Sequence, residues 1–359
     1  MRMSSVKISV LIAFYFFTQL TFCQNNALKN FDALWEIFNE NYASFEEKKI
    51  DWDVVREKYR PQINNETSDA ELFSIFKKIL KPLNDGHVSL RAKNIDSAFS
   101  ASRDSRIISE LKSIKKRDRK SQFKKMVAKM LADQEFDELK ELGPKFRDER
   151  LFAYANNNKV GYLRFMRSFS TLAKMKGASL NKQLDLIFDS FKNVDAIILD
   201  IRFNIGGDDA FSQAIAGRFV ANKVDGFYKQ TRKNKKFGSL KTKYITPTGH
   251  KPFLKPVILL TNDITVSAAD VLCIMMAPME NVTIIGEPSN GSYSDLYNKT
   301  LPNGWKLTLS NQRYFDINMN NYEGVGTPVD ITALNTKEDF ELLNDSVLTK
   351  ALETIANQD

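Results

Sequence analysis

Hydrophobic positions recur at helical spacing in the first part of the chain. One such face, at steps of three and four residues, consists of Leu28, Phe31, Leu34, Trp35 and Phe38. A second helix is predicted to begin at Ser68, because Glu71 follows three residues later as in a capping box, and to end at Pro82. We therefore predict an N-terminal helical unit over residues 24–90.

The next segment, 91–150, is rich in charge and again shows helical spacing. Its apolar positions are Ile107, Ile108, Leu111, Ile114, Phe123, Met126, Val127, Met130 and Leu131. Gly143-Pro144 closes the pattern, because a proline cannot continue a helix. The prediction for 91–150 is a helical, basic insert.

From residue 151 short apolar runs alternate with helical patterns. Strands are predicted at 160–165, 196–201, 257–260 and 282–285. Such alternation indicates βαβ units around a largely buried sheet, so the fold class is α/β, with a core over 151–340 and a C-terminal helix over 341–359. Near the end, a turn at 302–304 is expected to join two strands.

The N-terminus has the pattern of a secretory signal peptide. Arg2 and Lys7 precede an apolar run over 8–17, which is too short for a comfortable membrane span. We expect residues 1–23 to be removed after Cys23 and the protein to be exported, to a periplasm or beyond. A lipoprotein signal, with Cys23 acylated, is the alternative, but Phe22 stands where a small residue is expected.

Charge and composition argue against nucleic-acid binding and against a metal centre. The formal net charge of +8 falls to +6 when the signal is lost, and the excess lies between residues 103 and 129. An exported protein seldom meets nucleic acid, so we read this run as a solvated face, or as one that contacts an anionic envelope surface. Two histidines and no cysteine pair at ligand spacing predict no metal centre, and Cys273 in an apolar helix predicts a buried thiol.

Segment 265–270, Thr-Val-Ser-Ala-Ala-Asp, follows the strand at 257–260 after a short turn. A serine at the start of the next helix would lie beside backbone N–H groups that carry partial positive charge. Two interpretations stay open. Ser267 is an N-cap paired with Asp270, or it is a nucleophile beside an oxyanion site.

Two other loops, 204–207 and 286–292, also follow predicted strands. Ligand sites of α/β sheets gather where such loops meet. A serine nucleophile needs a base, and His87 lies on a turn, Asp85-Gly86-His87, next to a short strand. The competing interpretation is that His87 is merely structural.

Six motifs in one order resemble a known family, the C-terminal processing (tail-specific) and tricorn-core serine peptidases. The resemblance covers about 65–335, and its motifs are Asp85–Val88, Leu199–Gly207, Thr265–Asp270, Ile285–Pro288, Leu301–Gly304 and Glu323–Asp330. It implies a crotonase-like α/β catalytic core, no cofactor and a peptide or unfolded protein as substrate.

The chain departs from the processing peptidases at the base. Their lysine lies in a loop Gly-x-x-Thr-x-Gly-Lys, and here Ser292 takes that position, 25 residues after Ser267. Tricorn-like members instead use an upstream histidine oriented by a serine and a glutamate. The resemblance thus implies His87 as base, Ser292 and Glu323 as its supports, and the backbone of Ala268 and Gly206 as oxyanion donors.

A second departure is the segment 91–150, where processing peptidases usually carry a PDZ module and where we expect none. Recognition of free C-terminal tails is therefore not implied. Members that keep the histidine and lack the PDZ module also resemble the repeats of interphotoreceptor retinoid-binding protein, which bind apolar ligands. Two functions follow. One is an exported serine endopeptidase, and the alternative is a non-catalytic protein that binds apolar ligands or peptides on the same scaffold.

Overall fold

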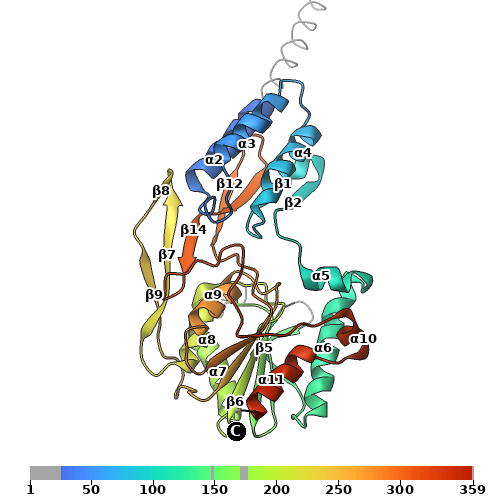
Figure 1. Ribbon diagram of the computed structural model, residues 1–359, viewed down its shortest axis with the longest axis vertical. Helices are drawn as coiled ribbons and strands as arrows, with labels where there is room; N and C mark the ends of the chain where they lie inside the picture. The colour runs from blue at the N-terminus through green and yellow to red at the C-terminus, as the bar shows by residue number, and fades with distance from the viewer. Residues whose placement is uncertain (1–25, 147–148, 170–176, 358–359) are drawn as a thin grey trace, which may run out of the picture. The chain divides into compact units, whose positions relative to one another are not determined.

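The computed structural model describes residues 26–146, 149–169 and 177–357 (Figure 1). The chain forms two compact units. The first comprises Met1–Arg103, Arg232–Phe237 and Asp295–Asn311, and the second comprises Asp104–Thr231, Gly238–Ser294 and Gln312–Asp359. The predicted signal peptide, with Cys23, lies outside the described residues.

The first unit begins with helices, as predicted. They are α2 (Asn26–Asn41), α3 (Trp52–Tyr59) and α4 (Asp69–Leu80). The capping box expected at the start of α4 is present: Ser68 Oγ accepts from Glu71 N at 3.3 Å, and the Glu71 carboxylate accepts from Ser68 N at 2.9 Å. Each group satisfies an amide that the first helical turn leaves unpaired.

A four-stranded antiparallel sheet completes the first unit, in the order β12-β13-β1-β2. Its strands are β1 (Ser89–Ala92), β2 (Ser97–Ser100), β12 (Leu296–Thr300) and β13 (Lys306–Ser310). The hairpin predicted around 302–304 is therefore confirmed. It pairs with β1 across the sequence, and Ser89 and Thr308, hydrogen-bonded at 2.7 Å, are 219 residues apart.

The hairpin is an integral part of the helical unit's core. Trp305 is buried, and its ring meets the edges or faces of Phe73 and Phe76 at centroid distances of 5.7 and 5.9 Å. The first unit thus extends beyond the predicted 24–90, because 91–103 and 295–311 share its core.

The second unit is built on a seven-stranded sheet in the order β15-β11-β10-β6-β5-β4-β3. Its strands are β3 (Lys140–Phe146), β4 (Glu149–Asn156), β5 (Val160–Phe165), β6 (Ala196–Asp200), β10 (Val257–Thr261), β11 (Val282–Gly286) and β15 (Ile331–Thr332). The strands from β5 to β15 are parallel, and β3 and β4 join antiparallel at one edge.

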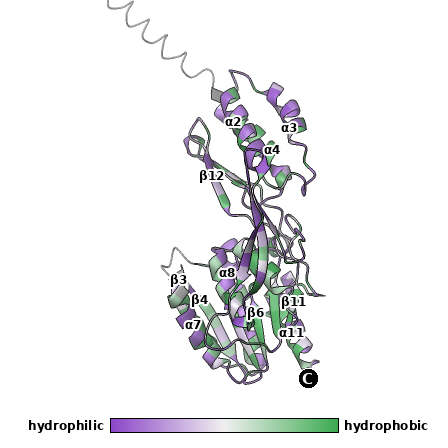
Figure 2. Cartoon of the chain, turned by 90° about the vertical axis from the view of Figure 1, so that its left-hand side faces the viewer, coloured by the Kyte–Doolittle hydropathy of each residue, from purple (hydrophilic) through white to green (hydrophobic). Residues whose placement is uncertain are grey.

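Helices cover both faces of this sheet, which makes three layers (Figure 1). On one face lie α7 (Gly177–Ser190), α8 (Asp209–Ala216) and α9 (Ala268–Met276), and on the other α6 (Lys116–Asp133), α10 (Lys337–Leu342) and α11 (Ser346–Ala356). Along β6, Ile197 and Leu199 enter the first core while Ala196 and Ile198 enter the second. The strands are accordingly apolar on both faces (Figure 2). The predicted α/β class is confirmed.

A smaller antiparallel sheet extends from the second unit. It pairs β7 (Val224–Lys233) with β9 (Lys241–Ile245) and β14 (Gln312–Phe315). The short strand β8 (Lys236–Phe237) pairs with the last residues of β7, inside the first unit.

The helical prediction for 91–150 is only partly correct. Helices α5 (Arg106–Glu110) and α6 are present, but 97–100, 140–146 and 149–156 are strands. The sequence does not predict strand β3, because it lies at a sheet edge, where charged residues replace the apolar run of a central strand.

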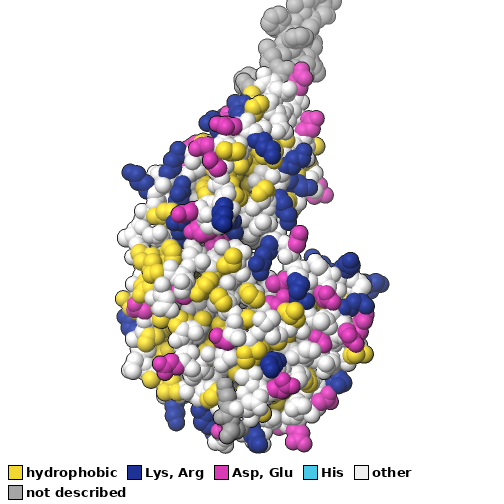
Figure 3. All heavy atoms as spheres, viewed as in Figure 1, with side chains coloured by type: hydrophobic (Ala, Val, Ile, Leu, Met, Phe, Trp, Pro, Cys, Tyr) yellow, Lys and Arg dark blue, Asp and Glu magenta, His cyan; other side chains and the backbone are white. Residues whose placement is uncertain are grey.

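The basic run lies on α5 and α6, where Lys and Arg side chains gather with acidic ones between them (Figure 3). Part of it is paired: Glu149 accepts from Lys120 at 2.5 Å and from Lys124 at 3.0 Å. The exposed members Lys112, Lys115 and Lys116 agree with a solvated face. Among the described residues, every helix is too short or too polar to cross a lipid bilayer.

Candidate active site

Ser267 occupies a strained turn between β10 and α9. Its dihedral angles are φ +64° and ψ −126°, in a region that residues with a β-carbon rarely adopt. Such strain costs about 1–3 kcal/mol and collects at functional sites. The side chain is half-buried, and its hydroxyl makes neither a cap hydrogen bond nor any other within the described part of its unit.

The backbone of Ser267 is held from two sides. Its N–H donates to the carbonyl of Ser292 at 3.0 Å and to Asp270 Oδ2 at 2.9 Å. The acidic half of the predicted Ser-x-x-Asp cap is therefore formed. An ordinary N-cap residue, however, has an extended backbone with a negative φ, whereas Ser267 has a φ of +64°.

Gly206, predicted to be an oxyanion donor, lies against this turn. A β-carbon on Gly206 would stand 2.5 Å from Ser267 Cβ and 3.1 Å from the amide nitrogen of Ala268. Its own N–H, however, donates to Asn204 Oδ1 at 2.9 Å. This corrects the prediction: Gly206 gives the close approach, but its amide is already engaged in this structure.

The next amide, that of Gly207, fits the donor role better. Ser168 N donates to the Gly206 carbonyl at 2.9 Å and Asp208 N to the Ser168 carbonyl at 2.6 Å, which makes a parallel bridge between Ser168 and Gly207. In this bridge the two neighbours of Gly207 make both hydrogen bonds to Ser168, so the N–H of Gly207 itself points away from Ser168. Among the described residues, no acceptor is found for the N–H of Gly207 or of Ala268. The sequence does not distinguish two adjacent glycines, so this assignment needed the hydrogen bonds.

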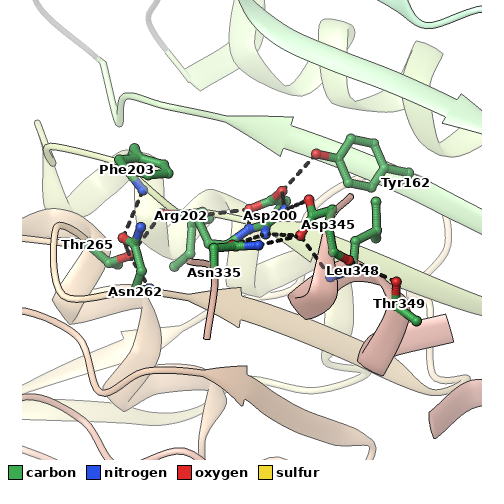
Figure 4. A network of polar contacts seen from close by, with 11 residues as sticks. Tyr162, Asp200, Arg202, Phe203, Asn262, Thr265, Asn335, Asp345, Leu348 and Thr349 are labelled. Atoms are coloured by element: carbon green, nitrogen blue, oxygen red, sulfur yellow. Dashed lines mark hydrogen bonds and ion pairs between the residues drawn. The ribbon is translucent and has the colours of Figure 1, made fainter. Parts of the chain in front are cut away.

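Side chains from the loop after β10 fix the loop after β6 (Figure 4). Phe203, at φ +61°, donates its N–H to Asn262 Oδ1 at 3.0 Å. Thr265 Oγ1 donates to the carbonyl of Ile201 at 3.0 Å. Since Thr265 lies two residues before Ser267, these bonds fix the glycine loop, residues 204–207, relative to the Ser267 turn.

Beneath the glycine loop lies a fully buried ionic network (Figure 4). Arg202 reaches Asp200 at 2.6 Å and Asp345 at 2.7 Å, and Tyr162 donates its hydroxyl to Asp200 at 2.8 Å. Burial would raise the pKa of Asp345, but the charge and hydrogen bonds of Arg202 outweigh it and leave that pKa lowered. The network joins the segment before α11 to the end of β6.

The third predicted loop meets the same turn. Besides accepting from Ser267, Ser292 donates its hydroxyl to Asn290 Oδ1 at 2.9 Å. Tyr293 N donates to Glu323 Oε2 at 3.3 Å, and Gly324 N donates to the Gly291 carbonyl at 2.7 Å. The second unit therefore brings the loops of Ser267, Ser292 and Glu323 together. The Ser292 loop thus lies directly beside the Ser267 turn.

His87 belongs to the first unit, where its backbone is well held. Its N–H donates to Asp85 Oδ1 at 2.8 Å, and its carbonyl accepts from Thr308 Oγ1 at 2.6 Å. The side chain is 8% exposed, and Nδ1 has no partner among the described residues of its unit. Burial lowers the pKa of His87, against the opposing charges of Asp85 and Asp295, so the imidazole is neutral near pH 7.

His250 and Cys273, the other histidine and the cysteine among the described residues, are poorly placed for catalysis. His250 has an 85% exposed side chain, with Nε2 3.7 Å from Asp185 Oδ2. Cys273 is fully buried in α9, as predicted, and burial raises the pKa of its thiol well above the ordinary value. A neutral, inaccessible thiol is a poor nucleophile.

Two family models match this chain. That of peptidase family S41 covers residues 159–333, which includes the Ser267 turn, the glycine loop and Glu323. That of the tricorn protease C1 domain covers residues 24–81, in the helices of the first unit.

The chain belongs to peptidase family S41, the tail-specific peptidases. It is accordingly a serine peptidase.

Solved structures of similar fold agree with this family. A candidate peptidase from Parabacteroides merdae is 25% identical, with a TM-score of 0.75 over 92% of this chain and 97% of that one. CPAF, solved with lactacystin, is 12% identical, with a TM-score of 0.66 over 94% and 100% of the two chains. A lipoprotein from Streptococcus agalactiae is 14% identical, with a TM-score of 0.54 over 93% and 97%. The last two show the fold alone.

Proposed function

We propose that this S41 peptidase is an exported endopeptidase in which His87, not a lysine, is the base for Ser267. One observation carries the proposal. The Ser267 hydroxyl has no hydrogen-bond partner in the described part of its unit and stands on a strained turn against the Gly206-Gly207 loop, where the N–H groups of Ala268 and Gly207 have no acceptor among the same residues. A nucleophile and an oxyanion site need this arrangement.

The mechanism assigns each group one task. Ser267 Oγ attacks a peptide carbonyl while His87 takes the hydroxyl proton and then returns it to the leaving amine. The N–H groups of Ala268 and Gly207 hold the oxyanion, each such donor being worth about 3 kcal/mol of barrier. Water, deprotonated by the same imidazole, then releases the acyl group.

The choice of histidine rests on what replaces the lysine. Ser292 fills the lysine position beside Ser267, and a hydroxyl cannot act as general base at neutral pH. His87 is neutral and has a free Nδ1 within its unit. We assign Glu323, directly or through Ser292, to orient the imidazole.

The site of action is part of the proposal. The basic start and apolar run of residues 1–17 favour export to a periplasm or the exterior, with acylation at Cys23 as the less favoured form. Substrates would be peptides or unfolded proteins, since catalysis needs an extended backbone at the serine. Mass spectrometry of the mature N-terminus tests export, because a chain that begins at Met1 would contradict it.

The decisive experiment is labelling with a fluorophosphonate, which reacts with activated serines. Wild-type protein should be labelled and should cleave a denatured protein, and Ser267→Ala should do neither. Ser68→Ala is the matched control: Ser68 is a true N-cap, so its loss should cost about 1 kcal/mol of stability and leave labelling unchanged. Folded wild-type protein that resists labelling would favour the binding-protein alternative.

A further inference from the structure

We propose that Asp270 is a positioning residue, whose ionised carboxylate locks the Ser267 turn to the Ser292 loop. This role rests on the proposed function of Ser267. Asp270 touches no reacting atom, because all its hydrogen bonds are to groups around the nucleophile and none is to the nucleophile's hydroxyl.

The geometry is that of a clamp. Asp270 Oδ2 accepts from the N–H of Ser267 at 2.9 Å and from that of Ser292 at 3.1 Å, and Oδ1 accepts from Gly291 N at 2.9 Å. Two of these donors lie 21 and 22 residues away in sequence. The side chain is fully buried, so water cannot replace a lost bond at this site.

Only a carboxylate fits this set of donors. Both oxygens face N–H groups, and the Ser289 hydroxyl also hydrogen-bonds the side chain. An asparagine of the same shape would turn an NH₂ group toward one or two of these N–H groups, losing their bonds. The Ser267 turn would keep its fold but lose some of the hydrogen bonds that stabilise its strained dihedral angles.

The clamp is sensitive to pH. Burial raises the pKa of Asp270 to about 6, although the hydrogen bonds from Ser289, Gly291, Ser292 and Ser267 oppose the rise. The other titratable groups that face it, Cys273 and Tyr293, have pKa values raised well above the ordinary ones and stay neutral. Protonation would make one oxygen a donor that faces other donors, so at least one clamp bond must break.

A test of the clamp that needs no activity follows the amides of Gly291 and Ser292 by NMR. In wild-type protein both should shift with pH around a midpoint near 6, and in Asp270→Asn neither should. Asp339→Asn is the matched control: this buried carboxylate also accepts from a backbone N–H and a hydroxyl, at Thr336 and Ser346, but in the C-terminal helices. It should leave the titration in place. Amides that ignore pH in the wild type would overturn the clamp.

The functional test measures the fluorophosphonate labelling rate against pH. If His87 and Asp270 must both be deprotonated, the logarithm of the wild-type rate should approach a slope of two below both pKa values, and Asp270→Asn should show a slope of one. At pH 8 that variant should label about 10²-fold more slowly, since small misplacements of a nucleophile cost that much. Peptide cleavage should lose kcat with little change in KM.

Two outcomes separate this proposal from the proposed function. If the amides titrate as expected but the wild type is never labelled, the clamp stands and the peptidase mechanism fails. If labelling is normal and Asp270→Asn leaves the rate and slope unchanged, the mechanism stands and the positioning role is wrong.

Discussion

The turn that carries Ser267 and the turn that carries His87 are built in opposite ways. Around Ser267 the backbone is strained, its N–H is bonded twice, and the loops after β6, β10 and β11 are tied to one another. Around His87 the backbone is fixed by Asp85 and Thr308, while Nδ1 has no hydrogen-bond partner among the described residues of its unit. The Ser267 turn is thus fixed by the loops of its own sheet, whereas the hydrogen bonds described for the His87 turn hold its backbone and not its ring. The two can therefore be perturbed separately.

The largest expected effect is on the base. His87→Ala should lower Ser267-dependent peptide cleavage by roughly 10³-fold or more, since a general base is a member of a unit that works only as a whole. Circular dichroism and thermal unfolding should show an intact fold. Undiminished labelling of His87→Ala would show that another group, such as a lysine, activates Ser267.

The second prediction concerns the buried ionic network of Arg202, Asp200 and Asp345. Arg202→Met would leave Asp200 and Asp345 buried without their partner and should lower the free energy of unfolding by about 3–5 kcal/mol. Urea denaturation measures this. Arg60→Met is the matched control, because the Arg60–Asp32 pair at 2.8 Å is partly exposed and should be worth about 0–1 kcal/mol. Equal losses in both variants would contradict the structural role of the buried network.

The third prediction tests how tightly the glycine loop fits the serine. Gly206→Ala places a methyl group 2.5 Å from Ser267 Cβ and should slow labelling about 10²-fold. Gly304→Ala is the control for backbone strain alone, because Gly304 also has a positive φ, of +84°, but nothing within 4 Å of an added β-carbon. Similar labelling of the two variants would mean that the turn tolerates displacement.

The smallest effect is a shift of the pH profile. The lowered pKa of His87 predicts that kcat/KM rises with pH, as the imidazole loses its proton, with a midpoint below the ordinary histidine value of about 6.5. The measurement is best made in Asp270→Asn, where only the histidine should remain to titrate. A midpoint in the alkaline range would instead indicate a lysine base.

Much of this arrangement follows from sequence pattern. The parallel strands were visible as apolar runs, and Ser267 was visible as a serine between a strand and a helix. Ser292 and Glu323 came from a family resemblance, and the second unit does bring their loops to the Ser267 turn. Whether they act as assigned stays a prediction.

Other features could not be predicted from pattern. Which of Gly206 and Gly207 offers its amide depends on Asn204, whose side chain takes one of the two. Strand β3, Lys140–Phe146, contains Gly143-Pro144 and lacks the apolar alternation by which a strand is predicted. The pairing of β1 with β13 joins segments that are far apart, and a short apolar strand does not specify which distant partner it will meet.

The pairing of β1 with β13 determines the order in which parts of the protein can fold during synthesis. Strand β1, which directly follows His87, lies between β2 and β13 in its sheet. The ribosome synthesises the whole Ser267 turn before it synthesises β13, at 306–310. Until then the histidine turn lacks Thr308, and closing a loop of more than 200 residues is a slow step of folding. The Ser267 turn is thus synthesised before the His87 turn is complete, so under the proposed mechanism an unfinished chain would lack its base.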